Sequence, residues 1–412
     1  MLPETKKYQT GLVILFFFTW GSVFLARMSV LYLAPFFAPE LHLSHEEVGL
    51  LASALALAWA GSGLIFGAVS DRIGRRRVLI PTVFLFSVLT WLSGVARSFG
   101  ELLLIRTMLG AAEGPTFPTM TSMIEASSEP KSRGRNIGIV VSAGALVGLA
   151  LAPVLTTQVA ARFGWRTAFF ITGLPGMILG LLIWRFVKEP EEAKGTGPHH
   201  AKPSLKDYLS LLRYRNMLLC CLGAVGFMTW LFVMHVFAPL YITEVSQRSA
   251  TLAGLIIGAG GLGAFMWGWI LPWISDRAGR KNTLIFAAIV SAAAPLTYQV
   301  PFLIAHPWLM ATAGFLVNGG QGIAPLVLVL VPTESVPAKL AATAVGLATL
   351  AGEIVGGAIA PAVAGAAANR YGLAAPLWIA SAGAVLVLLA SLCMTETAPS
   401  KTGLLKSGRA SA

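Results

Sequence analysis

Long apolar runs separated by short polar segments dominate this chain. They lie near residues 10–37, 47–70, 78–97, 101–124, 136–160, 166–187, 216–243, 250–274, 282–304, 307–331, 340–367 and 372–394. Each approaches or exceeds the roughly 20 residues that a helix needs to cross the hydrocarbon core of a bilayer. Only 12% of the residues are charged, against about 25% in a soluble domain. The pattern predicts an all-α integral membrane protein with twelve transmembrane helices.

A short basic turn occurs twice, once in each half of the chain. Asp71 and Arg72 begin the first copy, and Asp276 and Arg277 begin the second, 205 residues later. Each copy continues with a glycine that permits a tight turn and with further cations that hold the turn in water. The repetition predicts two similar halves, as in many transporters. We expect these four residues to act in gating between the halves.

The apolar runs form two sets of six, separated by a polar stretch. We therefore expect an N-terminal six-helix bundle over 1–190, a cytoplasmic linker over 191–214 and a C-terminal six-helix bundle over 215–412. Cys220, Cys221 and Cys393 all lie in apolar runs. We interpret them as buried hydrophobic residues and predict no metal site.

The net charge of +12 reflects Lys and Arg residues concentrated on one side of the predicted membrane. Of the 30 Lys and Arg residues, 23 fall on the side of both termini, 5 on the other side and two within spans. The positive-inside rule then places both termini and the linker in the cytoplasm, and we expect a bacterial inner membrane. The loops account for the charge without nucleic acid. We expect a monomer whose partners are lipid, protons and a small substrate.

Few ionisable residues lie within the spans. Arg27 is near the middle of the first span, Glu113 of the fourth and Glu353 of the eleventh, and His235 is toward the outer part of the seventh. Arg106 lies about one turn inside the outer end of the fourth span, where snorkelling could suffice. A charge at the bilayer centre costs about 2.5–3.5 kcal/mol on insertion scales, so such residues mark functional sites.

Arg27 is the candidate to hold an anionic substrate, because its planar guanidinium matches a carboxylate with two donors. Glu113, Glu353 and His235 are the candidates for proton coupling. A carboxylate beside Arg27 could stay ionised, and a pair of Arg27 with Glu113 could switch as a proton arrives. The alternative is a permanent Arg27–Glu113 ion pair that only fixes two helices together. The expected energy source is a proton gradient, and no cofactor is expected.

The tenth span carries a polar patch at similar depth, with Asn318 and Gln321 as candidate substrate-binding residues. Gln321 is the repeat counterpart of Glu113. Trp230 and Tyr32 could line a binding cavity. The alternatives are an interhelical hydrogen bond for the amides and interface anchoring for the aromatic side chains.

The fifth and eleventh spans carry small residues at four-residue spacing, followed by Pro153 and Pro361. Small residues let helices approach closely in lipid, and the prolines let helices bend. The two spans occupy equivalent positions in their halves. They therefore suit a pair of moving gates, although close packing alone would also explain the glycines.

The first basic turn, with Asp71, Arg72 and Gly74 followed by Arg75 and Arg76, resembles the signature of the major facilitator superfamily. The second copy at Asp276 fits it too, and the resemblance covers essentially the whole chain. Within that superfamily, three segments resemble the anion:cation symporters. They are Arg106 to Pro118 in the fourth span, Arg27 to Ser29 in the first and Gly352 to Pro361 in the eleventh.

This resemblance implies proton-coupled uptake of an organic anion, a carboxylate or sugar acid, by alternating access. Arg27 would bind the carboxylate and Glu113 would carry the proton. The chain departs from the pattern at two positions. Ala26 stands where many members have an acid, and Glu353 stands where many have Asn. The coupling acid could therefore have moved to the eleventh span, or the second proton site could be absent.

Two other functions compete with anion symport. A proton-coupled exporter of drugs or metabolites would share the fold, and its acids would suit a cation, but Arg27 argues against one. A membrane-bound enzyme or sensor would need a catalytic or signalling group. The sequence offers no nucleophile–base pair, phosphate loop or metal cluster in the spans, so we expect that the protein is not an enzyme.

Overall fold

The structure, a computed structural model, is helical throughout the residues it describes, which are 3–129, 132–189, 210–337 and 340–402. We call a rod one helix, or several helical segments that follow one another and together match one predicted span. The rods of the first half are α1 (Pro3–Glu40), α2 (His45–Ile73), α3 (Arg75–Ser93), α4 (Phe99–Glu113) with α5 (Thr116–Ser127), α6 (Arg133–Ala143) with η1 (Gly144–Leu151) and α7 (Ala152–Phe163), and α8 (Trp165–Phe186). Each coincides with one predicted span.

The rods of the second half follow the same order. They are α10 (Arg215–Leu240) with η3 (Tyr241–Val245), α11 (Ala250–Ala278), α12 (Arg280–Thr297) with α13 (Pro301–Ala305), α14 (Pro307–Val317) with η4 (Gly319–Gly322), α15 (Ile323–Pro325), η5 (Leu326–Leu330) and α16 (Val331–Ser335), α17 (Ala341–Ala351) with η7 (Gly352–Ile359) and α18 (Ala360–Tyr371), α19 (Ala374–Cys393) and the short α20 (Pro399–Thr402). Within the described ranges, nine helices are long and apolar enough to cross a membrane.

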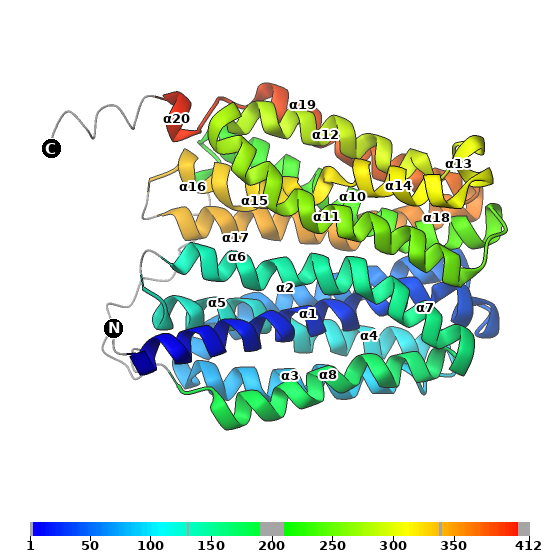
Figure 1. The fold of residues 1–412 in the computed structure, drawn as a ribbon, viewed down its shortest axis with the longest axis horizontal. Coiled ribbons are helices and arrows are strands. Elements are labelled where there is room, and N and C mark those ends of the chain that lie inside the picture. Colours follow the sequence, from blue (N-terminus) through cyan, green and yellow to red (C-terminus); the bar gives the residue numbers. More distant parts are fainter. Residues whose placement is uncertain (1–2, 130–131, 190–209, 338–339, 403–412) are drawn as a thin grey trace, which may run out of the picture.

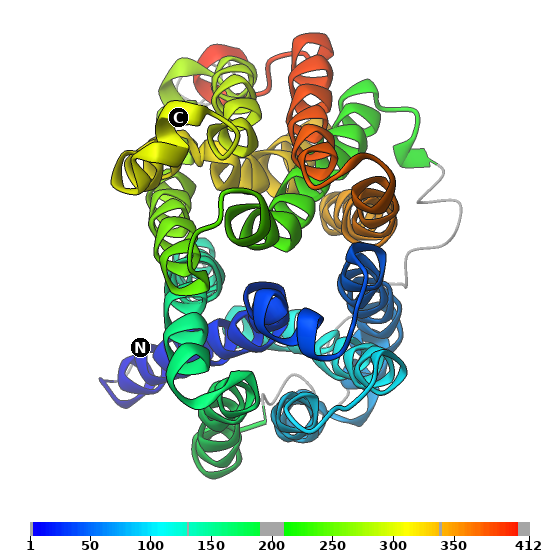
Figure 2. The same ribbon diagram turned by 90° about the vertical axis from the view of Figure 1, so that its right-hand side faces the viewer.

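The rods lie side by side, with α1 to α8 grouped below α10 to α19 in the view of Figure 1. Figure 2 shows the same grouping from the end of the rods. The start of α1 and helix α20 lie at one end, here called the terminal end; the opposite end is the far end. The domain boundaries at 190 and 215 stay predictions, and residues 190–209 of the predicted linker lie outside the described residues.

The repeated turn has the same build in both halves. Gly74 and Gly279 adopt φ of 107° and 103°, a conformation that favours glycine. A carboxylate from the end of each half caps the helix that follows the turn. Glu189 accepts from the backbone N–H groups of Arg75 and Arg76 at 2.7 and 2.9 Å. In the second half Glu396 accepts from those of residues 280 and 281 at 2.8 and 3.3 Å.

The fifth and eleventh rods both contain a π-helical segment of eight residues, η1 and η7. Pro153 and Pro361 follow these segments, and a proline has no N–H to donate to the carbonyl four residues earlier. Leu149 lies four residues before Pro153, so its carbonyl oxygen lacks this hydrogen bond. The same oxygen faces Gly261 of α11, and a Cβ added at Gly261 would lie 2.0 Å from it. The predicted irregularities therefore occur at matching places in the two halves.

The two halves touch closely at the far end. A Cβ added at Gly49 of α2 would lie 2.4 Å from the carbonyl oxygen of Pro361, and one added at Gly254 of α11 would lie 2.5 Å from that of Pro153. The ring of His45 also lies 2.9 Å from the carboxylate of Glu244. The contacts at Gly49 and Gly254 require a residue without a Cβ, so an added side chain at either position would force the two halves apart at the far end.

Gly49→Ala should therefore disfavour the closed far end. Alanine favours the helix itself, so the protein should fold, but its Cβ cannot coexist with the Pro361 carbonyl at the present distance. Electron–electron distance measurements between spin labels on α2 and α18 should show a longer population at the far end. Gly61→Ala is the matched control, because no atom lies within 4 Å of its added Cβ. Equal distances in both variants would contradict the expectation.

Candidate functional site

A buried ion pair joins the two halves of the molecule. Arg27 of α1 donates through Nη2 to Oε2 of Glu353 in η7 at 3.0 Å, and their side chains are 4% and 5% exposed. The Arg27–Glu113 pair suggested by the sequence is not what the described contacts contain. From α4, it is Arg106 that hydrogen-bonds to α1 at this level, while the carboxylate of Glu113 makes no hydrogen bond.

Two aromatic rings pack on the Arg27 guanidinium, one from each half. Its carbon lies 5.2 Å from the ring centroid of Trp59 and 4.7 Å from that of Phe232. Gly357 lets the pair and the Phe232 ring lie close against its helix, because an added Cβ there would lie 2.9 Å from Oε2 of Glu353 and 3.3 Å from the Phe232 ring. The Nε of Arg27 is buried and has no hydrogen-bond partner. One donor on the Nε–Nη2 edge therefore remains unused.

Arg106 is a residue whose role the sequence did not reveal. Its position near the end of a span suggested snorkelling, but the side chain is only 1% exposed. It donates to the carbonyl oxygens of Ala26 at 3.3 Å and Arg27 at 2.8 Å. Arg106 therefore fixes the α1 backbone from which the Arg27 side chain projects. The sequence feature that could have indicated this contact is the presence of a second arginine, besides Arg27, inside a predicted span.

Glu113 is fully buried at the end of α4, and neither carboxylate oxygen has a hydrogen-bond partner. Gly114 brings α4 against α2, since an added Cβ would lie 1.9 Å from the hydroxyl of Ser62. The hydroxyls of Thr116 and Thr119 on the next helix are also buried without partners. Buried polar groups are nearly always satisfied, so this unsatisfied group distinguishes Glu113 from a structural carboxylate.

Tyr32 and His235 meet across the two halves, with ring centroids 6.3 Å apart. The Tyr32 hydroxyl donates to the carbonyl of Gly148 at 3.2 Å. The Nδ1 of His235 lies 2.7 Å from the carbonyl of Leu231, so Nδ1 carries the hydrogen of that bond. The other ring nitrogen, Nε2, is buried without a partner. His235 therefore keeps one free acceptor.

The tenth rod breaks at the predicted polar patch. Helix α14 ends at Val317, and Asn318 precedes the 3₁₀ turn η4, which contains Gln321. The side-chain carbonyl oxygens of both amides have no hydrogen-bond partner, so the described contacts give no support to an interhelical bond through those oxygens. Trp230 lies against this turn, with its ring 2.4 Å from a Cβ added at Gly320. Its indole N–H donates to the carbonyl of Ser291 at 2.9 Å.

The predicted gating residues lie apart from this buried site, at the terminal end. Asp276 pairs with Arg280 at 2.6 Å, and Arg280 also pairs with Glu334 at 2.9 Å. The guanidinium of Arg277 packs on the Trp273 ring at 4.4 Å.

In the first copy of the turn, Arg72 is exposed. The backbone of Asp71 lies in α2, but its side chain is outside the described part of the structure.

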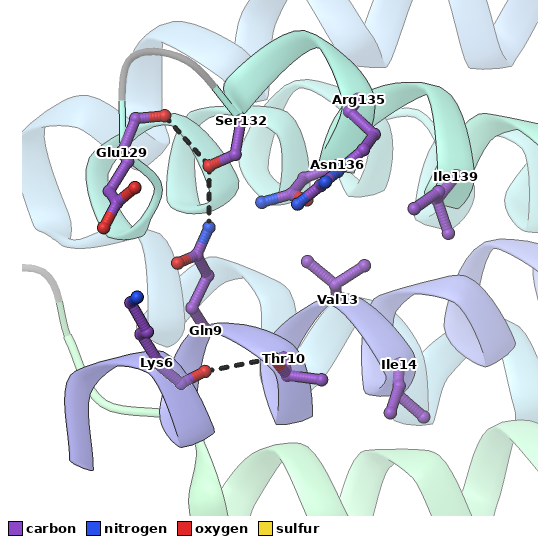
Figure 3. A pocket seen from close by; sticks show the side chains of 10 residues that line it. All are labelled: Lys6, Gln9, Thr10, Val13, Ile14, Glu129, Ser132, Arg135, Asn136 and Ile139. Atoms are coloured by element: carbon purple, nitrogen blue, oxygen red, sulfur yellow. Dashed lines mark hydrogen bonds between the residues drawn. The ribbon is translucent and has the colours of Figure 1, made fainter. Parts of the chain in front are cut away.

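A cavity of about 450 Å³ lies between α1 and α6 toward the terminal end (Figure 3). Its lining includes no residue predicted for the site: Lys6, Gln9, Thr10, Val13, Ile14, Glu129, Ser132, Arg135, Asn136 and Ile139. The amide of Gln9 bridges the two helices by donating to the Ser132 hydroxyl at 3.0 Å. This cavity is separate from the Arg27–Glu353 pair.

Comparison with known proteins agrees with this architecture. The hexuronate transporter of Bacillus subtilis (strain 168) is 28% identical over 312 residues, 73% of each chain. The D-galactonate transporter of Escherichia coli O6:H1 is 25% identical over 422 residues, covering 95% of this chain and 96% of its own. A solved bacterial homologue of the human lysosomal transporter Spinster, inward-facing and unoccupied, matches with a TM-score of 0.72 at 19% identity, over 95% of this chain and 96% of its own.

The sequence model of the Major Facilitator Superfamily matches residues 15–361. This match spans most of the chain and includes both halves, the repeated turn and the buried pair. It confirms the resemblance seen in the basic turns and the predicted membrane fold of twelve helices in two six-helix bundles. The protein is therefore a multi-pass membrane transporter and not an enzyme: the chain belongs to the Major Facilitator Superfamily.

Proposed function

We propose that the protein is a symporter that moves a small organic anion together with protons by alternating access. The observation that carries this proposal is the buried Arg27–Glu353 pair, which joins the two halves at the depth where a substrate would bind. The anion would be a carboxylate or a sugar acid, as the names of the hexuronate and D-galactonate transporters indicate for those relatives. We place the protein in a bacterial inner membrane as a monomer, with both termini cytoplasmic.

Arg27 would bind the substrate carboxylate in place of Glu353. The present pair uses Nη2 alone and leaves Nε without a partner. A substrate carboxylate lying along this edge could accept from both donors, and such paired hydrogen bonds are among the strongest in proteins. The substrate would therefore accept a hydrogen bond from Nε, which has no partner in the Arg27–Glu353 pair. This favours replacement of Glu353 by the substrate carboxylate at Arg27.

Replacement of Glu353 by the substrate carboxylate at Arg27 would couple substrate binding to the uptake of a proton. Once Arg27 has turned to the substrate, Glu353 is a buried carboxylate without its cation, and a lone buried charge is costly. Uptake of one proton by the Glu353 carboxylate removes that charge. One anion and one proton then enter the site together. Glu113, whose oxygens have no partner, would provide a second proton site, and His235 a third candidate through its free Nε2.

The same pair would link binding to the movement of the two halves, which we propose to be the bundles 1–190 and 215–412. Arg27 is on α1 and Glu353 is on η7. Breaking the pair removes one connection between the bundles and leaves the far-end contacts as the main barrier to opening there. The π-helical segments η1 and η7 are the places where the gating rods could bend, since such segments often mark functional sites.

The exporter hypothesis differs from symport in direction and in the charge of the cargo. A cationic drug would meet the guanidinium of Arg27 as a like charge. Uptake into proteoliposomes under an inward proton gradient supports symport, whereas proton-driven loss of a cation from loaded vesicles would support export.

Glu113→Gln tests the proposed second proton site. The amide mimics the protonated acid and cannot release a proton. The variant should bind and exchange labelled for unlabelled substrate at rates within about threefold of the parent protein, because Arg27 and its partner Glu353 are unchanged. It should accumulate less substrate than the parent protein under an imposed proton gradient, because one of the proposed proton sites is lost while Glu353 remains. Counterflow and gradient-driven uptake on one preparation separate the two steps. Normal accumulation would remove Glu113 from the coupling mechanism.

Glu353→Gln tests the exchange at Arg27. Removing one partner of a buried ion pair typically costs about 3–5 kcal/mol, so the empty variant should unfold at lower temperature. If a substrate carboxylate replaces Glu353, that carboxylate should restore more stability to the variant than to the parent protein. Thermal unfolding with and without a carboxylate found by screening measures both effects. A destabilised variant that no carboxylate rescues would mean that the pair is only structural.

Arg27→Lys tests the substrate anchor. Lysine keeps the charge but replaces the two-donor edge with a single ammonium group. Apparent affinity should fall by roughly 10- to 100-fold, since a hydrogen bond to a charged group contributes about 1.5–3 kcal/mol. Arg166→Lys is the control and should transport normally, because the Arg166 side chain is 40% exposed and pairs with Glu40 outside the buried site. Unchanged affinity in Arg27→Lys would exclude Arg27 as the anion site.

A further inference from the structure

We propose that the substrate is a flat, conjugated monocarboxylate, such as an aromatic or polyunsaturated acid, and not a polyhydroxylated sugar acid. This inference rests on the proposed function, because it assumes that Arg27 holds the anion. It starts from the surroundings of the guanidinium. Trp59 from the first half and Phe232 from the second place their rings 5.2 and 4.7 Å from its central carbon.

The plane of the guanidinium determines the shape of a ligand that fits here. A carboxylate that accepts from two donors of one arginine lies in the same plane as the guanidinium. In a conjugated acid the carbon body continues in that plane. Rings that already pack on the guanidinium can then pack on the body of the acid. A sugar acid has tetrahedral carbons and hydroxyl groups next to its carboxylate, and these would meet the apolar ring faces.

The charges in the spans favour a single carboxylate. Among the described residues of the predicted spans, Arg27 and Arg106 are the two buried arginines, and Arg106 donates to the carbonyl oxygens of Ala26 and Arg27. A second carboxylate on the substrate would therefore lack a free cation among the described spans. It would also add negative charge near Glu353 and Glu113, which are both buried.

The hydrogen-bonding groups around the site point the same way. The Tyr32 hydroxyl and the Trp230 indole N–H already donate to backbone carbonyls. A polyol needs several free donors and acceptors, because each buried hydroxyl without a partner is costly. Among the predicted site residues, Arg27, Glu113, His235, Asn318 and Gln321 keep unpartnered atoms, and so does the indole N–H of Trp59. Arg27 and Trp59 are the ones in contact at the guanidinium, and their two donors suit a carboxylate with one polar substituent on an otherwise apolar acid.

Matched pairs of acids test the inference directly. Benzoate and cyclohexanecarboxylate differ mainly in flatness, as do sorbate and hexanoate, while gluconate provides the polyol. Binding of each acid to the purified full-length protein is measured by calorimetry, with Arg27→Lys in parallel. We expect the flat acids to bind about three- to tenfold more tightly than their puckered or flexible partners, as aromatic contacts allow. Gluconate should bind most weakly.

Phe232→Leu identifies the source of the preference. Leucine keeps an apolar side chain of similar bulk but has no ring face, so the preference for benzoate over cyclohexanecarboxylate should fall while binding still depends on Arg27. Phe286→Leu, an exposed site on α12, is the control. Gluconate binding more tightly than benzoate, dependent on Arg27, would overturn the substrate class and leave the anion site intact. Binding of the panel without dependence on Arg27, or no binding at all, would overturn both proposals.

Discussion

A single buried charge determines much of the organisation of this protein. A guanidinium at the depth of Arg27 is unfavourable in hydrocarbon unless a counter-charge and further contacts accompany it. The structure supplies these from three directions: Glu353 from the eleventh rod, aromatic rings from the second and seventh, and Arg106, which secures the backbone beneath. The requirement to neutralise one cation thus brings together segments that are more than 300 residues apart.

The internal repeat gives this asymmetric centre a symmetric frame. Both halves carry the same glycine turn, the same terminal carboxylate and the same π-helical segment before a proline. The chemical groups do not repeat in this way. Glu113 in the fourth rod corresponds to Gln321 in the tenth, and Arg27 faces an acid that belongs to the other half. A shared scaffold with different residues at its centre would allow similar bending in each half while, as we propose, only the Arg27 side binds the anion.

Much of the fold could be predicted from the sequence because hydrocarbon imposes simple rules. Span length, the positions of charged loops and the doubled turn required no knowledge of packing.

The partner of Arg27 was harder to predict, because several acids lie at similar depth and periodicity does not show which way a helix is rotated. Glu113 was the expected neighbour, yet α4 presents Arg106 to α1. Arg106 itself was misjudged, since distance from a span's end says nothing about whether a side chain turns inward. The aromatic rings on Arg27 come from separate rods, so no local pattern could reveal them.

The carboxylate caps at Glu189 and Glu396 have a consequence for how force passes through the molecule. Each cap ties the segment that follows the sixth rod of a half to the start of the third rod, so these two rods are fastened together at the terminal end. A half fastened in this way resists shear between these rods. Under the alternating access that we propose, each half would therefore move as one body, because its third and sixth rods cannot slide past each other without breaking a cap.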